Sequence, residues 1–194
     1  LGTPVVAAYA IGRRVIMLAM MPAWGYSTAS STLVGQAVGR GDRDEATAYG
    51  WQTLRIAVVT QLLIAAAMVL AARPIAELFN TESVGLTVDF IRVFGLAVGG
   101  FSVARTMRGG LRGAGDTTWP LYGMAGGMAL RLGAAALALP AGFAVTVLGV
   151  TVTPGLGLGL VGVFGAMLLD FYAQAAVNAF RFWTGKWWAV ARQA

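Results

Sequence analysis

The 194-residue chain contains no cysteine and no histidine. Without cysteine it has no disulfide and no thiolate nucleophile, and without either residue it cannot build an ordinary structural zinc site. The absence of histidine also excludes a Ser–His–Asp triad. Only eight residues are acidic, and their scatter along the chain argues against a metal-dependent active site. The composition therefore excludes the most common hydrolytic and metal centres, and we expect neither enzyme activity nor a cofactor.

Charged residues are also scarce, at 11% of the chain, whereas 58% of its residues are hydrophobic. An average soluble domain is about 25% charged and about 45–50% apolar. A single soluble core of this length could not bury so much apolar surface, and the mean hydropathy of +0.72 points the same way. These values exclude a soluble globular domain, a disordered tail and a coiled coil. They predict an all-α, polytopic transmembrane helix bundle.

Five apolar stretches are long enough to cross a bilayer, for which a helix needs about 20 residues. The first, residues 5–37, is longer than this and contains Pro22 and Gly25, so we expect a bend near residues 18–22. The other four predicted spans cover about residues 52–72, 84–106, 120–139 and 156–180. The chain begins with Leu1 inside apolar sequence, from which we expect it to be a fragment of a longer protein.

The connection between the last two spans is apolar but too short to cross a membrane alone. Residues 145–153 alternate β-branched side chains around a central Leu-Gly pair, which is typical of a hairpin on the membrane surface. An unstructured extension of the fourth helix is the alternative.

The basic excess of the chain, a net charge of +6, lies mainly at one end of the predicted spans. Basic residues gather in the loops 38–50 and 107–119 and near the C-terminus, whereas residues 140–155 contain none. Short cytoplasmic loops are enriched in Lys and Arg, so we expect the C-terminus in the cytoplasm of a cell-membrane protein. Five tryptophans fall at the same level, as in an interfacial belt: Trp51, Trp119, Trp183, Trp187 and Trp188. The enrichment of basic residues on the predicted cytoplasmic side accounts for the positive net charge, so we expect no nucleic-acid partner.

Asp170 is the clearest ionisable residue inside a predicted span, where charge is costly and therefore a candidate for function. Gln174 and Asn178 follow it at four-residue spacing, so the three share one helix face. Arg131 on the preceding span lies at a similar depth, roughly 16 Å from the cytoplasmic end at the helical rise per residue. We expect Arg131 and Asp170 to pair, either as a structural ion pair or with Asp170 as a proton- or cation-responsive carboxylate.

Other polar and small residues have both structural and functional explanations. Gln36 either lines a cavity or hydrogen-bonds to another helix, and Asp89 and Arg92 are placed to pair locally. Four acidic residues are most simply helix caps: Asp42, Asp44, Glu45 and Asp116. Another set either lines an adaptable apolar pocket or packs between helices: Tyr9, Met17, Met20, Met21 and Trp24. Glycines recur at four-residue spacing and either allow close helix packing or let helices bend and slide: Gly35 with Gly39, Gly95 with Gly99, and Gly123 with Gly127.

Two motifs in this pattern resemble those of multidrug and toxic compound extrusion (MATE) transporters. The first lies in residues 7–46 and contains Pro22, Gly25, Ala29, Val34-Gly35-Gln36, Gly39-Arg40-Gly41-Asp42 and Ala46. The second is Leu111-Arg112-Gly113-Ala114-Gly115-Asp116-Thr117, with Pro120 three residues later. Together, at this spacing on predicted membrane helices, they make essentially the whole chain resemble this family.

The resemblance implies a twelve-helix fold of two lobes, in which residues 1–194 form helices 8 to 12, a partial C-terminal lobe. Family members are secondary antiporters that export cationic or amphipathic drugs and metabolites by alternating access, in exchange for sodium or protons. Their coupling acids lie on helix 1, or on helices 7 and 10. At the matching position of helix 10 this chain has Phe101 and no carboxylate nearby. The resemblance therefore places the coupling-ion site in the missing N-terminal lobe, which would be a partner of this chain along with the lipid bilayer.

Two other functions are alternatives to drug export. A flippase for lipid-linked precursors or polysaccharides shares the broad architecture, but the motifs quoted above favour a drug exporter. An intramembrane enzyme needs clustered Asp, His or Ser–Lys groups at membrane depth, and only Asp170 and Arg131 lie that deep.

Overall fold

The computed structural model describes residues 3–78, 84–139, 142, 145–147, 150–152 and 155–192. Its five long helices are α1 (Thr3–Gly39), α2 (Arg43–Leu70), α4 (Val84–Gly113), α5 (Thr118–Leu137) and α6 (Gly159–Trp183). Two short helices, α3 (Ala72–Leu78) and α7 (Trp187–Ala191), and two short strands, β1 (Val145–Val147) and β2 (Val150–Val152), complete the described structure. The predicted all-α helix bundle is confirmed.

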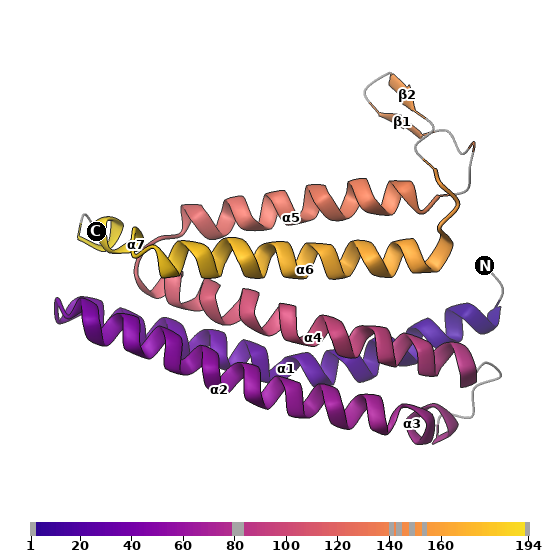
Figure 1. The fold of residues 1–194 in the computed structure, drawn as a ribbon, viewed down its shortest axis with the longest axis horizontal. Helices are drawn as coiled ribbons and strands as arrows, with labels where there is room; N and C mark the ends of the chain where they lie inside the picture. Colours follow the sequence, from indigo (N-terminus) through magenta and orange to yellow (C-terminus); the bar gives the residue numbers. More distant parts are fainter. Residues whose placement is uncertain are drawn as a thin grey trace.

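Helix α4 occupies the centre of the bundle. It packs against α1, α2 and α6, whereas α5 packs mainly on α6. Figure 1 shows α4 between the α1/α2 pair and the α5/α6 pair, with the N-terminus near the end from which the hairpin projects and the C-terminus at the other end. The long helices therefore run from one end of the molecule to the other, as transmembrane spans do.

Three helices are both long and apolar enough to cross a membrane within the part of the chain that the structure describes. They are Arg43–Leu70, Thr87–Gly113 and Gly162–Trp183. Large apolar side chains point outward from the bundle; Leu63 on α2, for example, is 67% exposed. Such an outward apolar surface is favourable when lipid or another protein segment covers it. The transmembrane bundle is thus supported, while α1 and α5 as further spans remain a prediction.

Two helices extend beyond the predicted membrane spans. Helix α2 starts at Arg43, before the span predicted from about residue 52, and α4 continues to Gly113, beyond the span predicted to about residue 106, so part of the predicted loop 107–119 is helical. The Arg73-Pro74 pair does not stop the chain from being helical, because it lies in the first turn of α3, where the missing proline N–H needs no partner. Residues 79–83, between the second and third predicted spans, lie outside the described residues.

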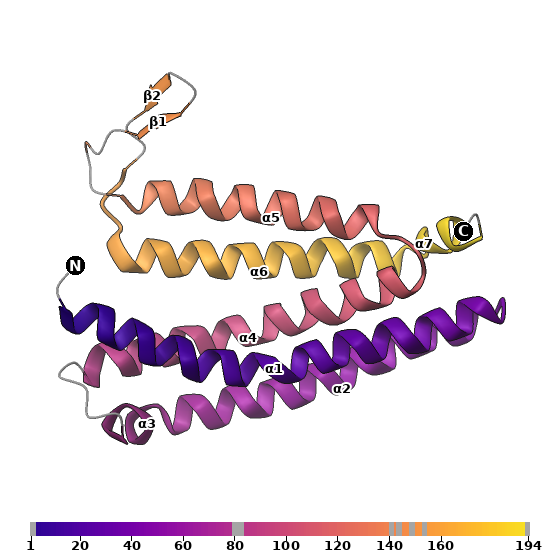
Figure 2. The same cartoon turned by 180° about the vertical axis from the view of Figure 1, so that it is seen from behind.

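The predicted bend of α1 is visible in Figure 2, where the helix changes direction near its middle. Pro22 lies inside α1, close to its midpoint, and its ring removes one helical hydrogen bond.

After α1 the chain turns tightly into α2. Gly41 has a φ of +75°, and Asp42 caps α2 by accepting a hydrogen bond from the Glu45 N–H at 2.8 Å. Glu45 does not complete a capping box but pairs with Arg40, and this hydrogen bond raises the pKa of Arg40.

The connection between α5 and α6 contains the predicted hairpin. Strands β1 and β2 pair antiparallel, with Val145 opposite Val152 and Val147 opposite Val150. Figure 1 shows these strands projecting beyond the ends of α5 and α6. Their alternating β-branched residues, rather than an extension of α5, therefore determine the local structure.

Buried side chains form two clusters, one toward each end of the bundle. The cluster toward the hairpin end of the bundle, named the outer end here, includes Ile91 and Phe94 of α4. The cluster toward the C-terminal end, named the inner end, includes Met107 and Leu111 of the same helix. Trp187 belongs to the inner cluster and is fully buried, with its ring stacked on Phe182 at 5.2 Å between centroids. Its placement in an interfacial belt was therefore wrong, because it closes the end of the bundle instead.

Candidate functional site

Asp170 lies at the centre of a polar network between α4, α5 and α6. Its side chain is 5% exposed, and its Oδ2 lies 3.7 Å from Nη1 of Arg131 on α5, so the predicted contact is present. The Gln174 amide donates a hydrogen bond to Asp170 Oδ1 and accepts one from the Arg108 guanidinium. Asp170 is thus held from two sides, by a cation from α5 and an amide on its own helix.

Arg108 is the member of this network that the sequence analysis did not identify. It lies on α4 and is 7% exposed, and its Nε has no hydrogen-bond partner among the described residues. Because α4 was expected to end near residue 106, Arg108 was assigned to a cytoplasmic loop. The signal that could have found it is the spacing of Arg105, Arg108 and Arg112, which places three cations on one helical face.

Asn178 continues the polar face of α6 one turn further toward the inner end. It is fully buried, and neither its amide oxygen nor its amide nitrogen has a hydrogen-bond partner among the described residues. Unpaired buried amide groups are costly, so a further polar partner at Asn178 would be stabilising.

Glycines on α5 make room for this polar face. A Cβ at Gly127 would lie 2.4 Å from Asp170 Oδ1, and one at Gly123 would lie 3.5 Å from Asn178 Oδ1. The spacing of Gly123 and Gly127 therefore allows helix packing that brings the α5 backbone against the side chains of α6.

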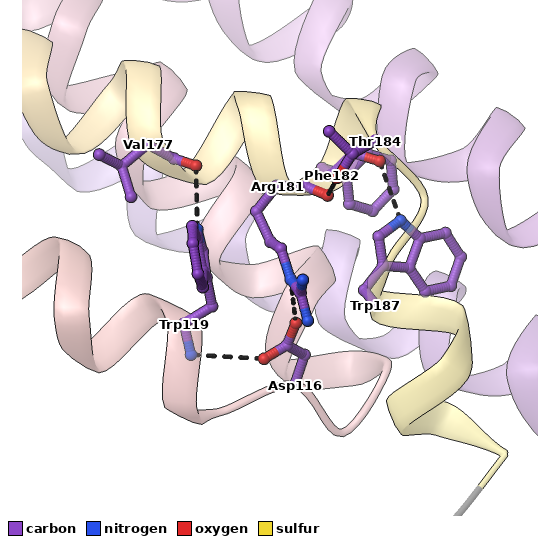
Figure 3. A network of polar contacts seen from close by, with 7 residues as sticks. All are labelled: Asp116, Trp119, Val177, Arg181, Phe182, Thr184 and Trp187. Atoms are coloured by element: carbon purple, nitrogen blue, oxygen red, sulfur yellow. Dashed lines mark hydrogen bonds and ion pairs between the residues drawn. The ribbon is translucent and has the colours of Figure 1, made fainter.

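A second polar network fixes the inner ends of α5 and α6 (Figure 3). Asp116 accepts a hydrogen bond from the Trp119 N–H at 3.3 Å, so it caps α5 as expected. The same carboxylate forms an ion pair with Arg181 of α6 at 2.7 Å, and both side chains are mostly buried. Asp116 is therefore more than a cap, because it joins the loop before α5 to the end of α6. The Trp119 indole adds a hydrogen bond to the Val177 carbonyl at 3.3 Å.

The structure brings the two sequence motifs together. A Cβ at Gly35 of α1 would lie 3.1 Å from the Gly113 carbonyl oxygen of α4, and one at Gly113 would lie 2.2 Å from the Ser31 carbonyl oxygen. Gly115, with a φ of +82°, makes the turn after α4. In contrast, Gly25 and Gly39 have open space around them, so no close contact explains them.

Two other candidates are placed differently from the expectation. Gln36 is exposed on α1, and among the described residues its side chain forms no hydrogen bond to another helix, so its alternative role in lining a cavity stays a prediction. Asp89 and Arg92 are both exposed at the outer end of α4, and the described residues contain no ion pair between them. They line a surface depression with Arg73 instead.

An apolar cavity of about 160 Å³ lies between α1, α4 and α6. Its lining includes Met17 and Met20, two of the residues expected to line an adaptable pocket, with Phe94, Met167 and Phe171 opposite them. Met21 and Trp24 are more than half exposed on α1, and the side chain of Tyr9 lies outside the described residues. The cavity and the polar network thus share two helices, α4 and α6.

Comparison with known proteins identifies the fold family. The MatE family profile matches residues 1–137. The chain belongs to the MatE family. This match covers both glycine-containing motifs and helices α1 to α5, so the resemblance expected from the sequence is confirmed.

A curated relative extends the match to the end of the chain. It is the probable multidrug resistance protein NorM of Thermotoga maritima, which is 25% identical over 188 residues. The alignment covers 96% of this chain but 38% of the relative's length. This MatE-family chain therefore aligns with less than half of the length of this relative.

Proposed function

We propose that the full-length protein is a cell-membrane efflux transporter that exports small amphipathic or cationic compounds in exchange for sodium or protons. The match of the MatE profile to residues 1–137 carries this proposal, and the similarity to a probable multidrug resistance protein supports it. We further propose that residues 1–194 form helices 8 to 12 of a twelve-helix fold, a partial C-terminal lobe that alternates in access against the lobe encoded elsewhere.

Asp170 is proposed to act as a structural charge and not as the coupling acid. Its carboxylate is buried, paired with Arg131 and hydrogen-bonded by Gln174, so a free cation would have to displace existing partners. Phe101, on the helix where some relatives carry an acid, is buried against Phe171. The coupling carboxylate is therefore proposed to lie in the N-terminal lobe.

The test is transport by the purified full-length protein in liposomes. Ethidium or norfloxacin is loaded, and its movement is followed by fluorescence under a sodium gradient alone and under a proton gradient alone. We expect movement under one gradient, abolished by the ionophore that dissipates it and absent from protein-free liposomes. No gradient-dependent movement of any amphipathic probe, with a correctly folded protein, would contradict the proposal.

A further inference from the structure

The cavity between α1, α4 and α6 lies on a face of α4 that continues toward Arg105, with α1 and α6 each packed on α4. We call this face of α4, together with the side chains of α1 and α6 that contact it, the groove. Its apolar end is lined by Ile16 and Met17 of α1, Phe94 of α4, and Met167 and Phe171 of α6. Phe101, two turns further along α4, packs edge-to-face on Phe171 with 5.3 Å between ring centroids. Aromatic and methionine side chains from three helices thus form an adaptable surface for an apolar body.

The same face of α4 becomes basic one turn beyond Phe101. The Arg105 guanidinium lies 5.1 Å from the Phe101 ring centroid and 5.7 Å from the Trp24 ring centroid, so it is held between side chains of α4 and α1. Arg108 and Arg112 follow at three and seven residues, and Arg112 contacts Ser27 of α1 at 3.4 Å. The groove therefore changes from apolar to cationic along its length.

These three arginines lack a matching set of carboxylates. Within the described part of the chain, none of Arg105, Arg108 and Arg112 forms an ion pair. The carboxylate nearest to them in this network, Asp170, already pairs with Arg131. Arg108 is buried with an unpartnered Nε. Three cations near a single carboxylate, which Arg131 shares, leave an excess of positive charge on a membrane helix, so this face favours an anion.

We propose that this groove binds amphipathic organic anions, with the apolar body at the Met17 and Phe94 end and the acidic group at Arg105. The Arg105 guanidinium lies over the Phe101 ring, and Phe94 and Phe101 are separated by about 10 Å along the helix at 1.5 Å per residue, which suits a ligand with two fused rings and a short acidic arm. Carboxylate, sulfonate and phosphate groups all match an arginine fork. The inference rests on the proposed function and narrows its substrates, since the cationic face repels the cations expected from the family resemblance.

A pair of fluorescent probes with one shared fluorophore tests the charge preference. Dansylglycine carries a carboxylate and dansylcadaverine an ammonium, and their Kd values are measured by fluorescence titration of the full-length protein in phosphatidylcholine nanodiscs. We expect dansylglycine to bind at least about tenfold more tightly, as one charge-assisted hydrogen bond would produce. Equal Kd values, or tighter binding of dansylcadaverine, would overturn the proposal.

Substitutions of the groove arginines test whether the preference for dansylglycine arises in the groove. We expect Arg105→Gln to weaken dansylglycine binding by about tenfold, Arg112→Gln to weaken it less because Arg112 is exposed, and Arg105→Lys to retain most of it. The matched control is Arg55→Gln, an exposed arginine on α2 outside the groove. If Arg105→Gln fails to fold, the Arg112→Gln and Arg105→Lys titrations still decide the question. Unchanged dansylglycine binding in the folded Gln variants would overturn the proposal.

Two further results separate this inference from its alternatives. The first result concerns lipid. If phosphatidylglycerol copurifies with the wild type but not with Arg105→Gln, and dansylglycine does not bind, the occupant is a lipid headgroup and the proposal is overturned. Gradient-driven ethidium movement without a preference for dansylglycine would refute the groove assignment alone. Selective dansylglycine binding, without gradient-driven movement of any probe, would support the groove and refute the transport proposal.

Discussion

The Asp170 carboxylate has two cationic neighbours in different surroundings. Arg131 is about half exposed, with a side-chain exposure of 49%, whereas Arg108 is buried and reaches Asp170 through Gln174. A half-exposed arginine can turn toward water or lipid headgroups when its partner is lost, but a buried arginine cannot. The two ends of this network are therefore not equivalent.

Asp170→Asn should destabilise the protein more than Arg131→Gln. Removing the carboxylate charge weakens the hydrogen bond from the Gln174 amide and takes away the negative charge near the buried Arg108, and a hydrogen bond to a charged group contributes about 1.5 to 3 kcal/mol. Removing the half-exposed Arg131 should cost less, because the buried carboxylate keeps the Gln174 hydrogen bond and the positive charge of Arg108 beyond it. The thermal unfolding midpoint of the full-length protein, followed by size-exclusion chromatography after heating, measures the difference.

The double variant is the control for this prediction. If Arg131 were the main partner, Asp170→Asn with Arg131→Gln would recover most of the stability lost in Asp170→Asn alone. We expect little recovery, because Arg108 remains buried in the double variant. Equal midpoints for the two single variants would contradict the unequal environments seen here.

At the level of helices, the contact of α1 with α4 depends on two glycines facing carbonyl groups. A Cβ at Gly109 would lie 2.1 Å from the Ser27 carbonyl oxygen, and one at Gly113 would lie 2.2 Å from the Ser31 carbonyl oxygen. These obstacles are backbone atoms and cannot rotate away. The two helices must therefore separate if either glycine is replaced.

Gly109→Ala should loosen the α1–α4 contact and lower the stability by about 1 to 3 kcal/mol, the usual cost of overpacking. The matched control is Gly126→Ala, a glycine within α5 whose added Cβ would meet nothing within 4 Å. Alanine favours a helix over glycine, so Gly126→Ala should be neutral or stabilising. Thermal unfolding midpoints of the two variants compare them directly, and equal midpoints would show that the close approach does not limit stability.

The sequence predicted which long helices exist, but it did not predict where they end. Long apolar runs identified all five long helices, and alternating β-branched residues identified the hairpin. The inner end of α4 was missed because glycines and arginines were interpreted as loop residues, whereas Gly109 and Gly113 pack against α1 inside the helix. This error also hid Arg108 from the candidate site, although the depth of Asp170 and Arg131 was enough to predict their contact.

Long-range partners were harder to predict than residue roles. Asp116 was recognised as a cap from its position before a helix, which is a local signal. Its ion pair with Arg181 joins residues 65 positions apart and depends on how α5 folds back along α6. Likewise, tryptophan is a residue type common at membrane interfaces, but the turn after α6 directs the Trp187 ring into the inner cluster.

Across the whole molecule, the two ends have different chemistry. The inner end carries the Asp116–Arg181 pair, buried aromatic rings and most of the loop arginines, while the outer end carries the α3 helix and the β1–β2 hairpin. Figure 1 places the hairpin and the C-terminal helix α7 at opposite ends of the bundle. If the bundle spans a membrane, these two segments must lie on opposite sides of it.

The absence of cysteine from this chain allows a direct test of the proposed orientation. Single cysteines are introduced as Thr146→Cys in β1 and Arg192→Cys after α7, in a full-length protein whose other cysteines are replaced by serine. Because basic loops favour the cytoplasm, a membrane-impermeant maleimide added to intact cells should label Thr146→Cys. It should label Arg192→Cys only after permeabilisation. Thr53→Cys, at a buried position in α2, is the control that should react only after denaturation. Labelling of Arg192→Cys alone in intact cells would show the opposite orientation. Labelling of both cysteines in intact cells would contradict a bundle whose two ends are separated by the bilayer.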